Sequence, residues 1–410
     1  LLLHYGTKDD PGLMLIDGGP SKVYGPQLKP RLNAIREARG LEDHESLPID
    51  LLMVSHVDDD HIQGILDLTS ELATTSGTRY VEIANFWHNT FDDVIGNDPK
   101  ELTSAFTAQF GPAALTMSFS EDELFEAKGA NTVTRETAKI LASIEQGHRL
   151  RGNIKALKAE LNAEFKGKLI LASSDIFEFD AGLTFVVAGP MVTELRALQK
   201  KHDQWLESHK EDESDEVPAA YADKSVPNLS SIVVFAQCKG KSILLTGDAR
   251  GDKILEGLEE VGVLQAGKAI DVDVLKVPHH GSSNNLETDF FERIRAKHYV
   301  FSGNGEHGNP ERETLGMLLD ARGQEPFTIH LTYPVSDIDD ERKKDWLKEQ
   351  SKEVTRAAKN PEKTVRENWS PKKHSLTAFF EQRPLAEGQE LVINDGTTPH
   401  VIDLVGHLGY

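Results

Sequence analysis

The sequence has a single cysteine, few aromatic residues and no long apolar run, and each shortage excludes a class of protein. One cysteine, Cys238, among 410 residues excludes an internal disulfide framework and fits a reducing compartment, so we expect a cytoplasmic protein. No apolar run approaches the roughly 18 residues that cross a bilayer, so we expect no membrane partner. Aromatic residues at 7% and hydrophobic residues at 38% are enough for a globular core.

Basic residues are also scarce, at 45 against 67 acidic ones, and the formal charge of −22 opposes nonspecific binding to nucleic acid. Residues 342–374 are the exception, with eleven Lys and Arg against five Asp and Glu. One interpretation of their roughly helical spacing is a phosphate-binding stripe for a nucleic-acid partner. The pattern favours the other interpretation, a solvated helix with internal salt bridges, because Asp345, Glu349 and Glu353 each precede a basic residue by three positions.

Short runs rich in Val, Ile and Leu alternate with helical patterns, which predicts an α/β fold. The predicted strands are 1–6, 13–17, 49–55, 80–87, 168–172, 183–189, 230–237, 241–247, 272–277, 298–303 and 327–333, with strand-like pieces at 376–382, 390–395 and 400–405. The predicted helices are 27–39, 61–73, 250–262, 286–296 and 310–322. Segments 230–237 and 241–247 are close enough to form a hairpin, so we expect mixed sheets.

The pattern predicts a core domain over residues 1–335 and a charged extension over 336–410 that packs on or beside it. Residues 98–166 are mostly helical in pattern and are expected to form an insertion in the core domain. Residues 207–225 are acidic and poor in apolar side chains, which predicts a mobile loop.

Polar side chains that can bind metal follow four of the predicted strands. Ligands bind near strand carboxyl ends in layered α/β folds, so these side chains could converge on one centre. Three or more His and three or more Asp suit one or two divalent ions. The four places are "LMLIDGG" (Asp17), "LLMVSHVDDDH" (His56, Asp58, Asp60 and His61), "ILLTGDA" (Asp248) and "VLKVPHHGSS" (His279 and His280).

The spacing within "SHVDDDH" has a geometric meaning. His56 and Asp58 alternate in a tight loop and can face one ion, while Asp60 and His61 can diverge toward a second ion. Asp248 would then bridge the two ions, and His280 would complete the coordination of the second ion. Two ions that clamp a hydroxide and a leaving oxygen hydrolyse esters without a Ser or Cys nucleophile.

The ordered motifs D-G-G, H-x-D-x-D-H, G-D and H-H-G-S resemble the metallo-β-lactamase fold hydrolases. More narrowly, they resemble the ComEC-like competence-protein branch, in which H-x-D-x-D-H replaces H-x-H-x-D-H and N-x-S-S precedes the G-D hairpin, here "VPNLSSIVVFAQCKGKSILLTGDA". The resemblance runs from Asp17 to about Pro310, without the helical insertion, and implies a four-layer αββα sandwich with mixed sheets. The helical insertion and the C-terminal extension would be additions to this sandwich.

The resemblance also implies a role for each matching residue. Metal one would be held by His56 and Asp58, and metal two by Asp60, His61 and His280, with Asp248 bridging. Asp17, Asn228 and Ser282 would support the ligands from behind. Asn228 stands where many family members have a His ligand, so the site is richer in oxygen donors and the two ions would be zinc or manganese. The catalytic residues would be Asp60, His279 and His307.

Three further candidates have open alternatives. His279 could contact substrate or donate a proton, since His280 holds the family's ligand position before Gly281. His307 could act as the catalytic acid, or Asn309 could instead cap the helix that follows. Arg149 and Arg151 could bind a phosphate, although arginines are common on helix surfaces.

We therefore expect a metal-dependent hydrolase, most simply a phosphodiesterase or nuclease that uses a metal-bound hydroxide at a binuclear site. One alternative is a small-molecule hydrolase acting on a lactone, thioester or phosphate ester, because the fold alone does not fix the substrate. The other is a partner-regulated subunit of a larger system, with the insertion and the extension as docking surfaces.

Overall fold

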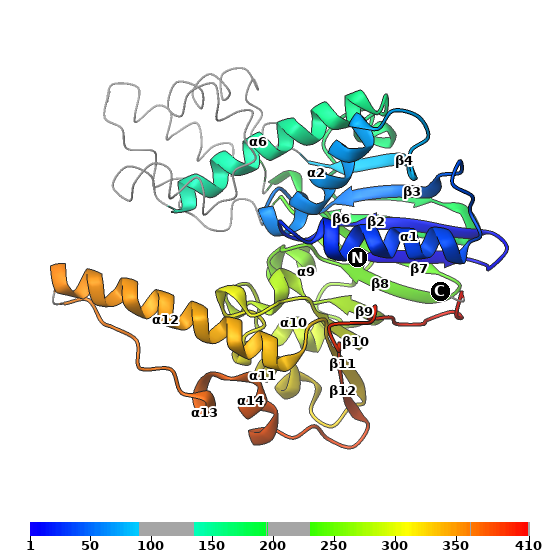
Figure 1. Ribbon diagram of the computed structural model, residues 1–410. Coiled ribbons are helices and arrows are strands. Elements are labelled where there is room, and N and C mark those ends of the chain that lie inside the picture. The colour runs from blue at the N-terminus through cyan, green and yellow to red at the C-terminus, as the bar shows by residue number, and fades with distance from the viewer. Residues whose placement is uncertain (90–134, 194, 196–229, 361, 409–410) are drawn as a thin grey trace. The chain divides into compact units, whose positions relative to one another are not determined.

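The computed structural model describes residues 1–89, 135–193, 195, 230–360 and 362–408 (Figure 1). The chain divides into two units. Unit 1 comprises Leu1–Val234 with Gly406–Tyr410, and unit 2 comprises Phe235–Val405. The predicted acidic loop at 207–225 and residues 98–134 of the predicted insertion lie outside the described residues.

Unit 1 contains a four-stranded mixed sheet in the order β1-β2-β3-β4. Strands β1 and β2 are antiparallel, whereas β2, β3 and β4 run parallel. The strands are β1 (Leu2–Gly6), β2 (Pro11–Ile16), β3 (Leu47–Val54) and β4 (Val81–His88). The last four residues of β3 are all buried, as expected for a parallel strand covered on both faces.

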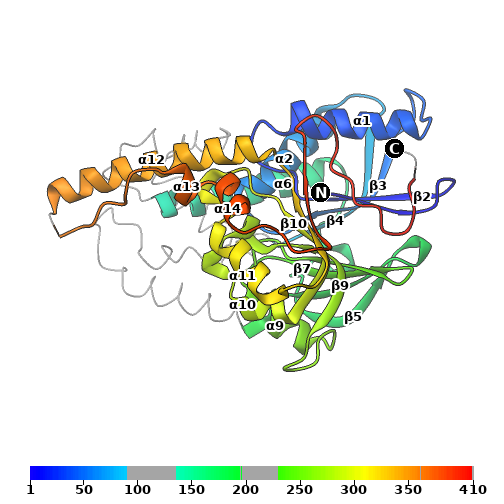
Figure 2. The same cartoon turned by 90° about the horizontal axis from the view of Figure 1, so that it is seen from below.

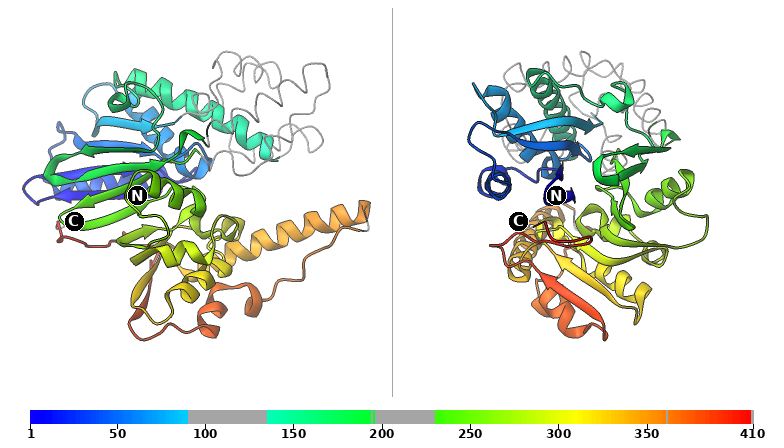
Figure 3. Two further views of the ribbon diagram at one scale, coloured as in Figure 1. Left: turned by 180° about the vertical axis from the view of Figure 1, so that it is seen from behind. Right: turned by 90° about the vertical axis from the view of Figure 1, so that its right-hand side faces the viewer.

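Helices pack on this sheet through apolar positions at helical spacing. The helical elements of unit 1 are η1 (Tyr24–Leu28), α1 (Lys29–Ala38), α2 (Asp59–Thr74), α6 (Arg135–Ala156), η3 (Ala163–Phe165) and η4 (Asp180–Gly182). Helices α2 and α6 lie side by side (Figures 1 and 3). Ile62, Leu66 and Leu150 belong to the same fully buried cluster as Leu52 of β3. Truncating one such leucine to alanine costs roughly 2–5 kcal/mol, so this core holds the start of α2 firmly.

An antiparallel pair, β5 (Ser173–Glu178) and β6 (Thr184–Gly189), completes the described strands of unit 1. The predicted strand at 168–172 is wrong, because those residues are irregular and the strand begins directly after them. Trp87 of β4 is fully buried, and its ring contacts those of Phe165, Phe177 and Phe185.

Strands β7 to β12 follow one another in space in the order β12-β11-β10-β9-β8-β7. Neighbours from β8 to β12 are parallel. Lys239 and Gly240, both with positive φ, join β7 to β8 in the two-residue turn typical of a hairpin, as predicted. The strands are β7 (Val233–Cys238), β8 (Lys241–Leu245), β9 (Ile270–Lys276), β10 (Ile294–Phe301), β11 (Phe327–Leu331) and β12 (Gln389–Ile393).

Helices connect the parallel strands of unit 2. They are α9 (Gly251–Glu260), η6 (Pro278–Gly281), η7 (Ser283–Asn285), α10 (Thr288–Arg293), η8 (Glu306–Gly308), α11 (Arg312–Arg322), α12 (Val335–Lys359), α13 (Pro371–His374) and α14 (Leu376–Gln382). The core includes the buried ring of Tyr299, which contacts the buried rings of Phe291 and Phe327 edge to face. The predicted α/β class with mixed sheets is confirmed.

The C-terminal extension is more helical than its sequence suggests. Residues 376–382 form helix α14 instead of a strand, and residues 400–405 are irregular. Helix α14 lies beside α12, with α13 preceding it (Figures 1 and 2). Among the described helices, none combines the length and the apolar character that crossing a membrane requires.

Candidate metal centre

In unit 1, the loop from β3 to α2 carries the H-x-D-x-D-H motif. Asp58 is the N-cap of α2 and has an extended backbone, yet its side chain makes no capping hydrogen bond. An N-cap aspartate usually accepts a hydrogen bond from the first turn of its helix. Here one carboxylate oxygen lies 3.8 Å from Nε2 of the buried His56 instead. The loop therefore presents Asp58 to His56 at the expense of the helix cap.

Asp17 holds this loop from behind. Its Oδ1 accepts the Ser55 N–H at 2.7 Å, and its Oδ2 accepts the Ser55 hydroxyl at 2.8 Å. The same Oδ2 lies 2.8 Å from Nδ1 of His61. Burial raises the pKa of Asp17, but the His61 ring and the Ser55 amide lower it further, and the net pKa lies well below its usual range. Asp17 is therefore ionised and fixes His61 with Nδ1 protonated and Nε2 ready to act as a ligand.

Gly18 allows this arrangement, because the loop after β2 passes directly over helix α2. A Cβ at Gly18 would stand 2.3 Å from the backbone nitrogen of Ile65. The Gly18 N–H also donates to the carbonyl of His61 at 2.7 Å. The first two residues of the D-G-G motif thus fix the start of α2 as well as the ring of His61.

The two histidines of this unit 1 cluster share one pattern. Nδ1 of His56 lies 3.1 Å from the Ser55 hydroxyl, and Nδ1 of His61 lies 2.8 Å from Asp17. In each ring, Nε2 therefore points away from the supporting residue. Nε2 of His56 lies 3.8 Å from Asp58, and Nε2 of His61 lies 3.9 Å from Asp60. Asp59, between the two carboxylates, instead accepts a hydrogen bond from Gln146 of α6 at 2.7 Å.

Unit 2 contains a second cluster, built on the loops after β8 and β9. Nδ1 of His280 lies 2.9 Å from the Ser302 hydroxyl, and its Nε2 lies 3.6 Å from Oδ2 of the buried Asp248. Nε2 of His279 lies 3.9 Å from the same oxygen. His279 and His280 both have left-handed backbones, with φ of 48° and 52°, so the chain accepts an unfavourable conformation to aim both rings at one carboxylate.

Lys276, at the end of β9, was not predicted as a site residue. Its Nζ lies 3.4 Å from Oδ1 of Asp248 and donates to the Gly247 carbonyl at 2.8 Å. A nearby ammonium group favours the ionised form of a carboxylate. No local sequence signal reveals this role, because the partner Asp248 lies 28 positions earlier in the chain.

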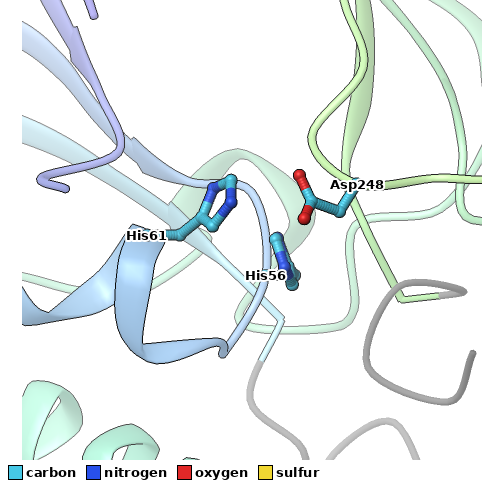
Figure 4. A group of neighbouring side chains, drawn as sticks. All are labelled: His56, His61 and Asp248. Carbon is cyan, nitrogen blue, oxygen red and sulfur yellow. The ribbon is translucent and has the colours of Figure 1, made fainter. Parts of the chain in front are cut away.

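The separations of 3.6–3.9 Å between imidazole and carboxylate atoms exceed hydrogen-bonding distance. They are close to the roughly 3.4 Å that separates two ligands on a tetrahedral ion with bonds of about 2.1 Å. In unit 1, donor atoms of His56 and His61 lie within 4.8 Å of each other. Figure 4 shows these two side chains, with Asp248 on the loop after β8. The donors present in each cluster therefore fit a divalent metal ion.

The remaining predicted residues have varied positions. His307 is exposed in η8, and Ser282 is buried and donates to Glu311 at 3.2 Å. The alternative role for Asn309 is wrong, because Glu311 is the N-cap of α11. Arg149 and Arg151 are half-buried on α6. Asn228 lies outside the described residues.

The basic segment 342–374 forms α12, a return stretch and α13. Two of its lysines pair with the acidic residue three positions earlier: Lys344 with Glu341 at 2.6 Å and Lys352 with Glu349 at 2.5 Å. Trp346 stacks on His374 at 4.0 Å and lies under the guanidinium of Arg366. These contacts are the ones expected for a solvated helix with internal salt bridges.

No protein-family model matches the chain. It is 33% identical over 98 residues to ComE operon protein 3 of Bacillus subtilis (strain 168), covering 23% of this chain and 12% of that protein. It is 33% identical over 85 residues to human microtubule-associated protein 1A, covering 20% and 3%. It is 45% identical over 51 residues to microtubule-associated protein futsch of Drosophila melanogaster, covering 12% and 1%. The similarity therefore spans a small part of each relative.

Proposed function

We propose that this protein is a metal-dependent hydrolase of the metallo-β-lactamase type, with its sheets packed in a four-layer αββα sandwich, and that it cleaves phosphodiesters, most simply in nucleic acid. The observation that carries the proposal is the repeated pattern in which Nδ1 of a histidine is held by a supporting side chain while its Nε2 faces a carboxylate. The partial similarity to ComE operon protein 3 supports the ComEC-like resemblance.

In this proposal the clusters supply the ligands of divalent ions, zinc or manganese. The donor groups would be His56, Asp58, Asp60 and His61 in unit 1, and Asp248 and His280 in unit 2. When bound, such ions activate water and stabilise the negative charge that develops on phosphate oxygens.

The residues of the chain would bind, orient and transfer protons. Asp17 would keep Nε2 of His61 in its ligand orientation, and Ser302 would do the same for His280. Lys276 would hold the Asp248 carboxylate in place through the contact between its Nζ and Oδ1. The His279 side chain is 30% exposed, against 17% for His280, so it is the better placed of the two to give a proton to the leaving oxygen.

The test is hydrolysis of bis(p-nitrophenyl) phosphate and of labelled single-stranded DNA by metal-stripped protein to which manganese or zinc is restored. We expect Asp60→Ala to lose 100-fold or more of the restored activity (roughly 3 kcal/mol of transition-state stabilisation). Asp59→Ala is the matched control, because the neighbouring carboxylate bonds to Gln146, and it should retain near-normal turnover. Equal losses in the two variants, or wild-type turnover without metal, would count against the proposal.

The substrate arms separate the alternatives. Cleavage of both substrates supports a nuclease, and cleavage of the small ester alone supports a small-molecule hydrolase. The similarity to microtubule-associated proteins favours, as a second candidate, a protein that acts through a partner. Metal binding without turnover of either substrate would support that candidate.

A further inference from the structure

Arg342 is a buried cation on α12, with only 9% of its surface exposed. Its Nη1 donates to the carbonyls of Gly308 and Pro310, and its Nη2 donates to the carbonyl of His374 at 3.0 Å. Within the described part of the chain it makes no ion pair. Burying a guanidinium against carbonyl groups alone costs free energy. A solvated position would be expected for an arginine on a helix of a charged extension.

The loop that Arg342 holds joins β10 to α11 and contains His307. Helix α12 presses on it directly, since a Cβ at Gly305 would stand 2.3 Å from the carbonyl oxygen of Ile338. The loop closes on itself through the Gly305 N–H, which donates to the Asn309 carbonyl at 2.8 Å. A planar guanidinium that bonds to both Gly308 and Pro310 therefore fixes the exit of this loop from two sides.

The exit of the loop supports the H-H-G-S-S turn of unit 2. The Glu311 N–H donates to the Gly281 carbonyl at 3.0 Å, and the Glu311 carboxylate accepts the hydroxyl of Ser283 at 2.8 Å. Asn309 Nδ2 lies 3.4 Å from the His279 carbonyl. A Cβ at Gly281 would stand 2.7 Å from the Phe301 ring and 3.0 Å from Pro310. The turn at residues 279–283 is therefore hydrogen-bonded to and closely packed against residues 309–311.

We infer that Arg342 is a positioning residue for His280. It holds residues 308–311, and these residues hold the left-handed turn that aims Nε2 of His280 at Asp248. The C-terminal extension is thus a working part of the metal centre. This inference rests on the proposed function, because it assumes that His280 and Asp248 bind an ion.

The test compares Arg342→Met, which keeps the side-chain volume, with Arg342→Lys, which keeps the charge but lacks the fork. Lys343→Met is the control, since Lys343 is exposed on the same helix. Zinc and manganese affinities are measured on metal-stripped protein by competition with a chromophoric chelator. We expect Arg342→Met to bind the weaker ion roughly 10- to 100-fold less tightly, Arg342→Lys to recover part of that loss, and Lys343→Met to match the wild type.

Turnover of bis(p-nitrophenyl) phosphate at saturating metal supplies the second readout. We expect kcat to fall in Arg342→Met while KM changes little, because the substrate does not contact this residue. Circular dichroism checks folding. If Arg342→Met fails to fold, the decision passes to Arg342→Lys and to Glu311→Gln, which weakens the same support from the other side.

Unchanged metal affinity and kcat in folded Arg342 variants would overturn the inference and leave the proposed function standing. A wild-type protein that binds neither ion would overturn both. A loss of thermal stability in Arg342→Met with normal metal affinity would assign Arg342 a structural role only, and would also overturn the inference.

Discussion

The two clusters each fix the orientation of a histidine ring, but they use different chemical groups to do so. In unit 1 a half-buried carboxylate, Asp17, holds Nδ1 of His61, whereas in unit 2 a hydroxyl, Ser302, holds Nδ1 of His280. A carboxylate partner makes the imidazole a stronger electron donor than a hydroxyl does. Unit 2 also has a cation, Lys276, next to its carboxylate. In the proposed metal centre, unit 1 is therefore expected to supply the stronger imidazole donor.

The largest expected effect comes from removing the charged support in unit 1. Asp17→Asn should lower metal affinity roughly 10- to 100-fold, because His61 loses its ionised partner. Ser302→Ala should cost clearly less, because it removes a neutral partner from His280. Chelator competition on the two metal-stripped variants measures both. Equal losses, or a greater loss in Ser302→Ala, would end the distinction between the clusters.

An acid-sensitive histidine chain in unit 2 provides the next effect. His330 is buried, its ring nitrogens lie 3.0 Å from His298 and 2.8 Å from His400, and burial with these neighbours lowers the pKa of His330 to about 4. Between pH 6.5 and 4 the unfolded chain binds a proton that the folded chain does not. The free energy of unfolding should therefore fall by about 2 kcal/mol between pH 7 and pH 5 from this residue alone.

Urea unfolding at the two pH values tests this expectation. His330→Gln should flatten the pH dependence, whereas His44→Gln, at an exposed position of unit 1, should leave it unchanged. A pH dependence of unchanged size in His330→Gln would assign the acid sensitivity to other groups, such as half-buried His4 of unit 1, whose pKa burial also lowers to about 4.

The smallest effect concerns the lysine of unit 2. Replacing Lys276 by Met removes a positive charge beside Asp248, so divalent cations should bind a few-fold more tightly, and the gain should shrink at high salt. Isothermal titration at two ionic strengths measures it, with Lys253→Met on α9 as the control. Weaker binding in Lys276→Met would show that the lysine orders Asp248 more than it competes with the ion.

The sequence predicted where the candidate ligand motifs lie relative to the strands, because each follows a strand with a clear apolar pattern. His56 to His61 lie where β3 gives way to α2, and Asp248 and His280 follow β8 and β9 as expected. Helix α14 was missed because "LTAFFEQ" is short and rich in apolar residues. The Ser375 hydroxyl that accepts the Ala378 N–H was the local sign of a helix start.

Lys276 and Arg342 could not be found in this way. Their roles depend on partners distant along the chain, Asp248 for Lys276 and the Gly308 and Pro310 carbonyls for Arg342. A lysine in a strand and an arginine in a charged helix look ordinary until tertiary structure brings these partners together. The strand error at 168–172 has a related cause, because Ile170 is buried by tertiary contacts while its backbone stays irregular.

The left-handed backbone of the predicted site residues has a consequence for protein engineering. Asp17, His279, His280 and His307 all have φ between 48° and 55°, a conformation that glycine adopts without cost. Replacing the exposed His307 by glycine would relax the backbone while deleting the side chain. A library selected for heat resistance alone would therefore accumulate such replacements and drift toward inactive proteins. Selection of this chain should couple survival on heating to catalytic output in every round.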